Sequence, residues 1–297
     1  MALTGWIIYN GSLNSDKFID YATMLQEAAH RQNSQTIILK NNEVLPILKH
    51  QQMELFHEQK LLPDYVIFID KDIYLANQLE LLGIPVFNKA RTISISDDKI
   101  LTYQILAKQH IPMPKTIIAP LSFFKMNPDT FYQLDNIILQ LGLPLIVKEA
   151  FGSFGEQVYL AHTKEELREI IQNIHGQAFM FQEFITTSYG KDLRLQVVNN
   201  QVVAAMKRTS QHDFRANITS GGRMEPYIPT QTEIDLAVAS SLAIGADFSG
   251  VDLLFGENGQ TLVCEINSNA HIRNLYDCTG INAADNMIKH VLTKLSK

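Results

Sequence analysis

The chain has 297 residues, a formal net charge of −6, 46% apolar residues and 19% charged residues. This length supports two or three compact units with a large buried core, and the acidic balance argues against a dedicated nucleic-acid binder. The chain has only two cysteines, so no disulfide framework is expected. It has no run of about 20 apolar residues, so no membrane span is expected. The N-terminal residues do not resemble a signal peptide, so we expect a cytoplasmic protein.

The first third of the chain alternates short apolar runs with helical patterns. The runs that predict strands are residues 6–9, 36–39, 65–69 and 84–87. A helix capped by Ser15 follows the first run, and a helix that stops at Gly83 precedes the last. Strands spaced by helices predict a small parallel sheet covered on both faces. The loop at residues 10–12 lies at a strand end, where ligands bind such sheets.

Beyond a predicted boundary at residues 88–96, the chain continues with mixed elements. The helices expected from apolar spacing lie at residues 97–109, 128–141, 233–244 and 282–295. The strands expected before residue 190 lie at residues 115–119, 143–148, 158–160 and 179–185.

A glycine-rich segment joins two of these predicted strands. Gly152 and Gly155 let backbone N–H groups approach an anion closely, and Lys148, at the end of the first strand, supplies positive charge for a phosphate. No G-K-[ST] sequence opens a helix here, so the pattern predicts a flap rather than a P-loop. An ordinary glycine hairpin without a ligand fits this segment equally well.

A turn at residues 199–200 predicts a hairpin that sets Asp192 opposite Lys207. Asp192, Arg194 and Lys207 then share the polar face of the hairpin. A cross-strand salt bridge at the surface is the alternative interpretation. The loop at residues 214–223 follows and carries two arginines and two adjacent glycines, which are residue types that suit the capture of an oxyanion.

A second hairpin, with a two-residue loop at Asn258-Gly259, places Asp252 opposite Glu265. Their Cβ atoms are then about 5 Å apart, and Asn267 points to the same face. Two adjacent carboxylates repel unless a cation neutralises them, and Mg²⁺ takes such oxygen ligands together with substrate phosphates. The hairpin therefore predicts a magnesium site, with a solvated acidic face as the alternative.

The order of these motifs resembles the ATP-grasp superfamily and, within it, the RimK-like amino-acid (glutamate-type) ligases. The matching residues are Asp98-Lys99, Lys148 with Gly152-Ser153-Phe154-Gly155, Gln182-Glu183-Phe184-Ile185, Asp192-Leu193-Arg194, Phe214-Arg215-Ala216-Asn217 with Gly221-Gly222, Gly250-Val251-Asp252, Glu265-Ile266-Asn267 and Thr279-Gly280-Ile281. Each motif is weak alone, but eight in the family's order are specific together. The resemblance covers roughly residues 95–297.

The implied fold class is α/β: a small parallel α/β domain followed by a two-lobed ATP-grasp fold of α+β lobes with antiparallel sheets. We expect the first domain at residues 1–94. The N-terminal ATP-grasp lobe, with its glycine-rich lid, would span residues 95–185. The C-terminal lobe, with the metal site, would span residues 186–297.

The resemblance also implies a role for each matched residue. ATP would be bound by Lys99, Lys148, Gly152, Ser153, Phe154, Gly155, Gln182, Glu183, Phe184, Ile185 and Asp192, with Lys207 beside them. Arg215 and Asn217, with Arg194, would act at the γ-phosphate and the developing acyl phosphate. Asp252, Glu265 and Asn267 would hold two Mg²⁺ ions, for which Mn²⁺ is an alternative.

The implied reaction is attack by a carboxylate on ATP and then by an amine on the acyl phosphate, which yields an amide, ADP and phosphate. The partners would be a small-molecule or peptide carboxylate and an amino-acid amine, without nucleic acid or membrane, and a homo-oligomer stays open. The alternative is an ATP-binding regulatory or partner subunit with a degenerate acceptor site. The retained metal and phosphate residues argue against it.

One segment departs from the family pattern. Many relatives follow the metal-binding Asn with small residues and Pro-Gly, whereas residues 268–274 of this chain read Ser-Asn-Ala-His-Ile-Arg-Asn. This segment should lie by the acceptor site, where His271 and Arg273 would read a carboxylate or position an amine. A salt-bridged loop without ligand contact is the alternative. This departure argues against glutamate as the transferred amino acid more than it argues against the ligase class.

Overall fold

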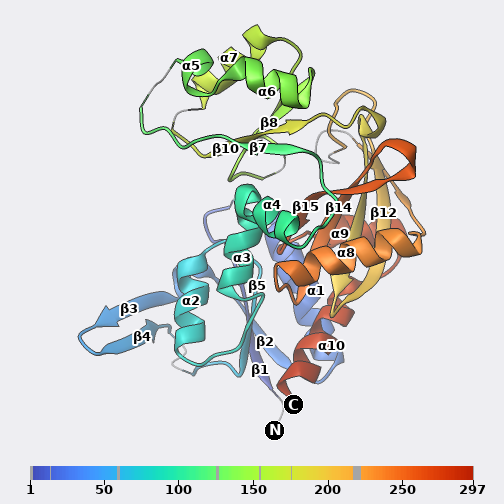
Figure 1. Cartoon of the computed structure of the whole chain (residues 1–297). Helices are drawn as coiled ribbons and strands as arrows, with labels where there is room; N and C mark the ends of the chain where they lie inside the picture. The colour runs from blue at the N-terminus through green and yellow to red at the C-terminus, as the bar shows by residue number, and fades with distance from the viewer. Residues whose placement is uncertain are drawn as a thin grey trace.

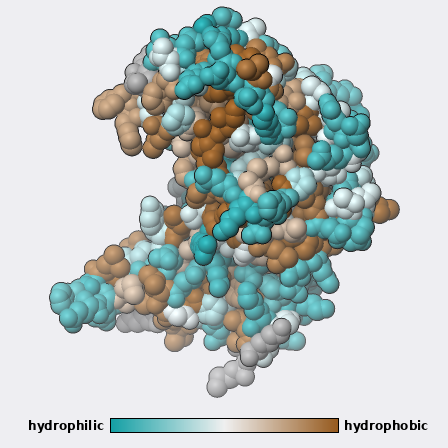
Figure 2. Space-filling model, in the orientation of Figure 1, coloured by the Kyte–Doolittle hydropathy of each residue, from teal (hydrophilic) through white to brown (hydrophobic). Residues whose placement is uncertain are grey.

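A computed structural model of the chain describes residues 3–13, 15–58, 61–124, 127–153, 155–174, 176–216 and 222–296. Figure 1 shows an N-terminal domain, an upper lobe around β7 to β10, and a lower lobe around β11 to β15. The expected sites Phe154 and Asn217 lie outside the described residues. In Figure 2 the surface is deeply hollowed on one side, beneath the upper lobe.

The N-terminal domain is built on a four-stranded parallel sheet in the order β2-β1-β5-β6. Its strands are β1 (Thr4–Tyr9), β2 (Gln35–Lys40), β5 (Tyr65–Phe68) and β6 (Val86–Phe87). Helices α1 (Asp16–Arg31) and α10 (Ala283–Leu295) pack on one face, and α2 (Ile73–Leu81) and α3 (Ala90–Asp97) pack on the other. The parallel sheet covered on both faces is therefore confirmed.

Helix α10 belongs to the core of the N-terminal domain, although it comes from the far end of the sequence. Its buried residues Met287, Ile288 and Val291 join the same apolar cluster as Leu25 of α1 and Ile67 of β5. The C-terminal segment predicted as part of the last lobe therefore shares its core with the first domain.

A hairpin of β3 (Leu45–Lys49) and β4 (Gln52–Phe56) projects from this domain (Figure 1) and was not predicted. Among the described residues, its strands pair only with each other. Apolar side chains such as Leu48 are exposed on it, so no burial pattern marks it in the sequence.

The segment at residues 88–96, predicted as a boundary, holds most of α3. The helix predicted from residue 97 begins instead as α4 (Lys99–Lys108), after a break at Asp98. The Asp98 side chain accepts hydrogen bonds from the backbone N–H groups of Ile100, at 2.9 Å, and Leu101, at 3.1 Å. This is the capping role that favours aspartate before a helix.

The upper lobe is an antiparallel sheet in the order β7-β10-β8-β9, with three helices packed on it. Its strands are β7 (Thr116–Ile118), β8 (Leu145–Glu149), β9 (Val158–Ala161) and β10 (Phe179–Glu183). Its helices are α5 (Pro128–Phe131), α6 (Leu134–Leu141) and α7 (Lys164–Asn173), of which α7 was not predicted. The single helix expected over 128–141 is divided at Gln133, which has a φ of 53°.

The lower lobe is a five-stranded antiparallel sheet in the order β13-β12-β11-β14-β15. Its strands are β11 (Lys191–Val198), β12 (Gln201–Thr209), β13 (Arg223–Pro226), β14 (Phe248–Phe255) and β15 (Thr261–Asn267). Helix α8 (Gln231–Ala243) contributes to the apolar core on one face, and α9 (Arg273–Thr279) packs against β12 and β13. No helix in the described part of the chain has both the length and the apolarity needed to cross a membrane.

Two β-bulges set the register of this sheet. In β14–β15 the two-residue loop was wrong, since Gly256 N–H donates to the Gln260 carbonyl at 2.7 Å and closes a longer loop. An extra residue at Cys264 shifts the register, so Asp252 still pairs with Glu265 as predicted.

Between β11 and β12, a bulge at Val203 shifts the register away from the predicted pairing. It pairs Asp192 with Arg208 and Leu193 with Lys207. The predicted pairing of Asp192 with Lys207 was therefore wrong. Lys207 lies on the opposite face of the sheet from Asp192 and pairs with Glu225 at 3.0 Å.

Candidate active site

One cavity of about 700 Å³ is lined by residues from all three parts of the molecule. The expected site residues that line it are Lys99, Lys148, Gly152, Ser153, Gly155, Gln182, Glu183, Phe184, Ile185, Asp192, Arg194, Arg215, Asp252, Glu265 and Asn267. Lys207 does not line it, and the arginine next in sequence, Arg208, takes that place. The segments that the sequence separates by more than 150 residues thus form one site.

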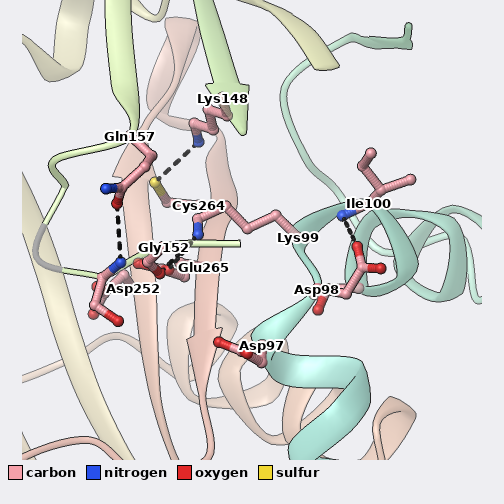
Figure 3. A network of polar contacts seen from close by, with 12 residues as sticks. Asp97, Asp98, Lys99, Ile100, Lys148, Gly152, Gln157, Asp252, Cys264 and Glu265 are labelled. Atoms are coloured by element: carbon pink, nitrogen blue, oxygen red, sulfur yellow. Dashed lines mark hydrogen bonds and ion pairs between the residues drawn. The ribbon is translucent and has the colours of Figure 1, made fainter. Parts of the chain in front are cut away.

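Two lysines from different elements point toward neighbouring residues of β15 in this cavity, Lys99 toward Glu265 and Lys148 toward Cys264 (Figure 3). Lys99 Nζ donates to the Gly152 carbonyl at 3.2 Å and lies 3.9 Å from Glu265 Oε1. Lys148 Nζ, at the end of β8, lies 3.8 Å from Cys264 Sγ. Both ammonium groups therefore point into the region that the glycine-rich segment covers, as a phosphate-binding role requires.

Burial and charge act differently on these groups. Burial lowers the pKa of Lys99, and the opposing charge of Glu265 offsets part of this effect. Burial likewise disfavours the Lys148 ammonium, but the Glu265 carboxylate, together with Cys264 and Tyr103 once these two are ionised, raises the pKa of Lys148 above its ordinary value. Burial raises the pKa of the Cys264 thiol to about 11, so this thiol is neutral at pH 7.

The glycine-rich segment between β8 and β9 needs its glycine for steric reasons. Gly152 has a φ of 137°, and a Cβ added there would lie 2.2 Å from Gln157 Oε1. The same Gln157 oxygen accepts a hydrogen bond from Ser153 N–H at 3.2 Å. A side chain at position 152 would therefore displace the glutamine that shapes the turn.

Two side chains from outside the lobe hold this segment. Lys71, which follows β5 of the N-terminal domain, donates to Ser153 Oγ at 2.9 Å and pairs with Asp97. Arg215, in the loop after β12, donates to the Gly155 carbonyl and pairs with Asp213 at 2.8 Å. Both contacts involve single hydrogen bonds to the lid, so they can be released one at a time.

Below the lid, the floor of the cavity is a cluster of buried charges on β11, β12 and β14. Arg208 binds Asp192 through two hydrogen bonds, of 2.7 and 2.6 Å. Arg194 binds Asp252 in the same bidentate way, at 2.7 and 2.6 Å, and Arg208 also reaches Asp252 at 2.9 Å. Burial opposes ionisation of Asp252, but the two guanidinium groups hold the pKa of its carboxyl below the usual range.

The carboxylates expected to bind metal differ in what they already contact. Two hydrogen bonds from Arg194 and an ion pair with Arg208 occupy most of the lone pairs of Asp252, since a carboxylate offers about four acceptor sites. Glu265 is about one-third exposed, and its nearest cation is Lys99. Asn267 Nδ2 is buried with no partner among the described residues. The oxygen donors fit a hard cation shared with a phosphate.

No three His, Cys, Asp or Glu side chains come together as a metal-binding group in the described ranges. Two carboxylates and one amide are nevertheless sufficient for Mg²⁺ when substrate phosphates complete its coordination.

The segment between the two lobes, Gln182 to Ile185, lines the end of the cavity away from Asp252. Gln182 Nε2 donates to Thr116 Oγ1 at 2.9 Å, and the Glu183 carboxylate accepts from Lys115 N–H at 2.6 Å. These side chains are occupied in fixing β7, so a flat ligand here would meet mainly backbone groups and the Phe184 ring.

At the other end, residues His271 and Arg273 face the N-terminal domain. Arg273 forms two hydrogen bonds with Asp20 of α1, of 2.9 and 2.6 Å. The His271 ring packs on Phe18 and Tyr21, with centroids 4.9 and 5.6 Å away. Burial lowers the pKa of His271 to about 4, so it is neutral at pH 7. The salt bridge named as the alternative is present, yet both residues line the cavity.

Sequence reasoning missed three contributors to the site: Arg208, Lys71 and Asp70. Arg208 follows Lys207, the residue that the sequence analysis expects at the site. The bulge at Val203 shifts the register by one residue, so Arg208 rather than Lys207 pairs with Asp192. Lys71 and Asp70 follow β5, at the strand edge where ligands are expected in parallel sheets. The sequence analysis expects a ligand at this edge in the loop after β1, at residues 10–12, but not in the loop after β5.

Comparison with known proteins places this cavity in a family. The RimK-like ATP-grasp domain matches residues 96–291. An uncharacterized MG012 homolog from Mycoplasma pneumoniae is 36% identical over 70% of this chain and 73% of its own length. The ribosomal protein bS6–L-glutamate ligase of Salmonella paratyphi B is 34% identical over 72% of this chain and 69% of its own length.

A solved D-alanine–D-alanine ligase from Bacillus anthracis shares the fold, with a TM-score of 0.74 and 15% identity over 99% of this chain and 98% of its own. The fold is thus that of ATP-grasp ligases. This chain belongs to the RimK-like ATP-grasp family.

Proposed function

We propose that this ligase joins a carboxylate to the amine of an amino acid, with release of ADP and phosphate. The observation that carries the proposal is the convergence of Lys99, Lys148, Glu265 and the glycine-rich lid in one cavity. The named bS6 relative is a glutamate ligase, which supports an amino acid as one substrate and a peptide or small-molecule carboxylate as the other.

In the first step, a carboxylate oxygen of the substrate attacks the γ-phosphorus of ATP, and the bond to the β-phosphate oxygen breaks. ADP leaves with the electron pair, and an acyl phosphate forms. Lys99 and Lys148 oppose the charge on the phosphates, while Arg215 lies at the lid end of the cavity, where the transferring group would sit.

In the second step, the amine nitrogen attacks the acyl carbon and loses a proton, and the C–O bond to phosphate breaks. Asp252, Glu265 and Asn267 would hold two Mg²⁺ ions, with Mn²⁺ able to replace them. The ions supply further neutralisation of phosphate charge. Arg194 and Arg208 fix Asp252 in place, because bidentate pairing leaves the carboxylate little freedom.

ATP would lie with its phosphates beneath Gly152, Ser153 and Gly155, and with its adenine against residues 182–185. Asp192 is bound to Arg208 through both oxygens, so it would contact the ribose only through a remaining lone pair. The assignment of Asp192 to ribose is therefore the weakest of these roles in chemical terms, and Lys207 drops out of the set.

The test is ADP release by the purified protein with ATP and Mg²⁺. Pools of carboxylates are crossed with the twenty amino acids, and mass spectrometry identifies the product. We expect ADP release that requires both an acid and an amine, and a product heavier by one amino-acid residue. Tight ATP binding without ADP release in any pool would contradict the proposal and favour a regulatory or partner subunit.

A further inference from the structure

Four aspartates are buried in the part of the chain that the structure describes, and one of them differs from the other three. The three with cationic partners are Asp192 with Arg208, Asp252 with Arg194, and Asp247 with Lys294. The fourth, Asp70, takes part in no ion pair between described residues, although it is only 6% exposed. A buried carboxylate without a cation is costly, so Asp70 calls for an explanation.

Asp70 lies two residues beyond β5, at the carboxyl edge of the parallel sheet, and lines the cavity. Its Oδ1 atom accepts a hydrogen bond from Asn10 Nδ2 at 3.0 Å. Its Oδ2 atom is buried and has no partner among the described residues. Burial raises the pKa of this carboxyl group, as expected for an uncompensated charge.

A second unpartnered acceptor lies beside it. Asn269 Nδ2 donates to the Asp70 backbone carbonyl at 2.6 Å, which fixes the two residues against each other. The Asn269 Oδ1 atom is buried and likewise lacks a partner in the described residues. Asn10, Asp70 and Asn269 all line the same cavity. This corner therefore offers negative charge and two buried acceptor oxygens, Asp70 Oδ2 and Asn269 Oδ1, that accept no hydrogen bond from any described residue.

The chemistry of the missing partner follows from these groups. An ammonium group carries three donors, one positive charge and no acceptor, so it can satisfy both oxygens and compensate the charge at once. A carboxylate or phosphate would be repelled. Asn269 is also two residues from Asn267, so the corner adjoins the part of the cavity that Glu265 and Asn267 of β15 line.

We propose that Asp70 and Asn269 form the subsite that binds the ammonium group of the amino-acid substrate, with Asn10 holding the Asp70 carboxylate in position. The choice of an amino acid as the ligand rests on the proposed ligase function. The location of the subsite rests on the unpartnered atoms Asp70 Oδ2, in the N-terminal domain, and Asn269 Oδ1, in the 268–274 segment. The departure of that segment from the family pattern thereby acquires a role in substrate recognition.

The test compares Asp70→Asn with Asp64→Asn. Asp64 precedes the same strand at its other end, is exposed and lies outside the cavity. Each protein is saturated with a non-hydrolysable ATP analogue and Mg²⁺. It is then titrated, with NMR detection, with the twenty L-amino acids and with their N-acetyl derivatives, which lack the ammonium group.

We expect the parent to bind at least one free amino acid and to bind its N-acetyl form at least about tenfold more weakly. Asp70→Asn should weaken binding of the free amino acid by about tenfold or more and leave the N-acetyl form unchanged. Asp64→Asn should match the parent. Asn269→Ala provides a second variant and should act in the same direction as Asp70→Asn. The melting temperature of Asp70→Asn should stay the same or rise, because the substitution removes a buried charge.

Three results would overturn the inference: no amino acid binds the parent, free and acetylated forms bind equally, or Asp70→Asn binds as the parent does. The proposed ligase function is judged separately by ADP release. Full amine-dependent turnover by Asp70→Asn with an unchanged KM would refute the subsite and leave the ligase intact. Asp70-dependent amino-acid binding without ADP release in any pool would support the subsite and contradict the proposed ligase function.

Discussion

The floor and the lid of the cavity hold their charged side chains in contrasting ways. On the floor, Asp192, Asp252 and Arg208 are buried and Arg194 is half-buried, and bidentate hydrogen bonds join each aspartate to one arginine. In the lid, Ser153 and Gly155 are held by single hydrogen bonds from Lys71 and Arg215, whose side chains are 46% and 31% exposed. Buried bidentate pairs are rigid, whereas exposed single contacts contribute little.

This difference separates two tasks. A carboxylate that holds a metal and a phosphate needs a fixed position, which the two arginines provide for Asp252. A lid must open to admit nucleotide and close over it, which weak contacts permit. The comparison can be tested at each of its charged residues.

The largest effect should follow from Arg208→Met. The substitution leaves Asp192 buried without a cation, so we expect a loss of about 3–5 kcal/mol in the free energy of unfolding. Denaturant unfolding measures it. Lys207→Met is the matched control, because Lys207 is adjacent in sequence and pairs with Glu225 near the surface. It should change stability by less than about 1 kcal/mol. Equal effects of the two variants would refute a rigid floor built on Arg208.

Glu265→Gln should separate stability from activity. Without metal, the melting temperature should change little, because the lost repulsion with Asp252 is offset by the lost attraction to Lys99. With ATP and Mg²⁺, turnover should fall by about 10²–10³-fold. ADP formation across a Mg²⁺ titration is the measurement, and Glu257→Gln, in the loop of the same hairpin, is the control. Parent-like activity of Glu265→Gln at low Mg²⁺ would remove the metal site from the proposal.

Arg273→Ala addresses the end of the cavity beside the N-terminal domain. If Arg273 reads a substrate carboxylate in addition to Asp20, the KM for that substrate should rise by tens of fold, on the order of 2 kcal/mol. Asp20→Asn keeps the arginine but weakens its present partner. An unchanged KM in Arg273→Ala, with a lowered melting temperature in both variants, would assign the pair to structure alone.

The smallest effect should follow from Lys71→Ala. The ion pair of Lys71 is nearly half exposed, so its loss should change stability by less than about 1 kcal/mol. Hydrogen exchange in the glycine-rich segment should nevertheless become faster in the nucleotide-free protein and return to the parent rate with ATP and Mg²⁺. Lys89→Ala is a control on the same domain. Identical exchange in parent and Lys71→Ala would show that the lid does not depend on this contact.

Much of the fold could be predicted because it follows from local periodicity. The strands and helices of the N-terminal domain repeat at periods that the sequence displays, and glycine, lysine and acidic motifs identify most of the cavity lining. The hairpin at β3–β4 could not be predicted in this way, because its apolar residues are exposed and show no burial pattern.

The register of strand pairing was harder to predict from the sequence than the type of each element. The sequence predicts the turns at 199–200 and 258–259, but the bulges at Val203 and Cys264 arise from packing between strands that lie far apart in the chain. One bulge preserved the pairing of Asp252 with Glu265, and the other replaced Lys207 with Arg208. The lack of a cationic partner for Asp70 among the described residues is likewise a tertiary property, visible only when the neighbouring elements are in place.

The position of α10 has a consequence for protein synthesis. Domains generally fold as units while the chain emerges from the ribosome, N-terminal first. Here one face of the first sheet is covered by α10 as well as α1, and the apolar side chains of Met287, Ile288 and Val291 complete that core. The N-terminal domain therefore cannot bury this face until residues 283–295 have been translated. Nascent chains arrested before residue 283 should expose it, and be bound there by chaperones that recognise apolar surface.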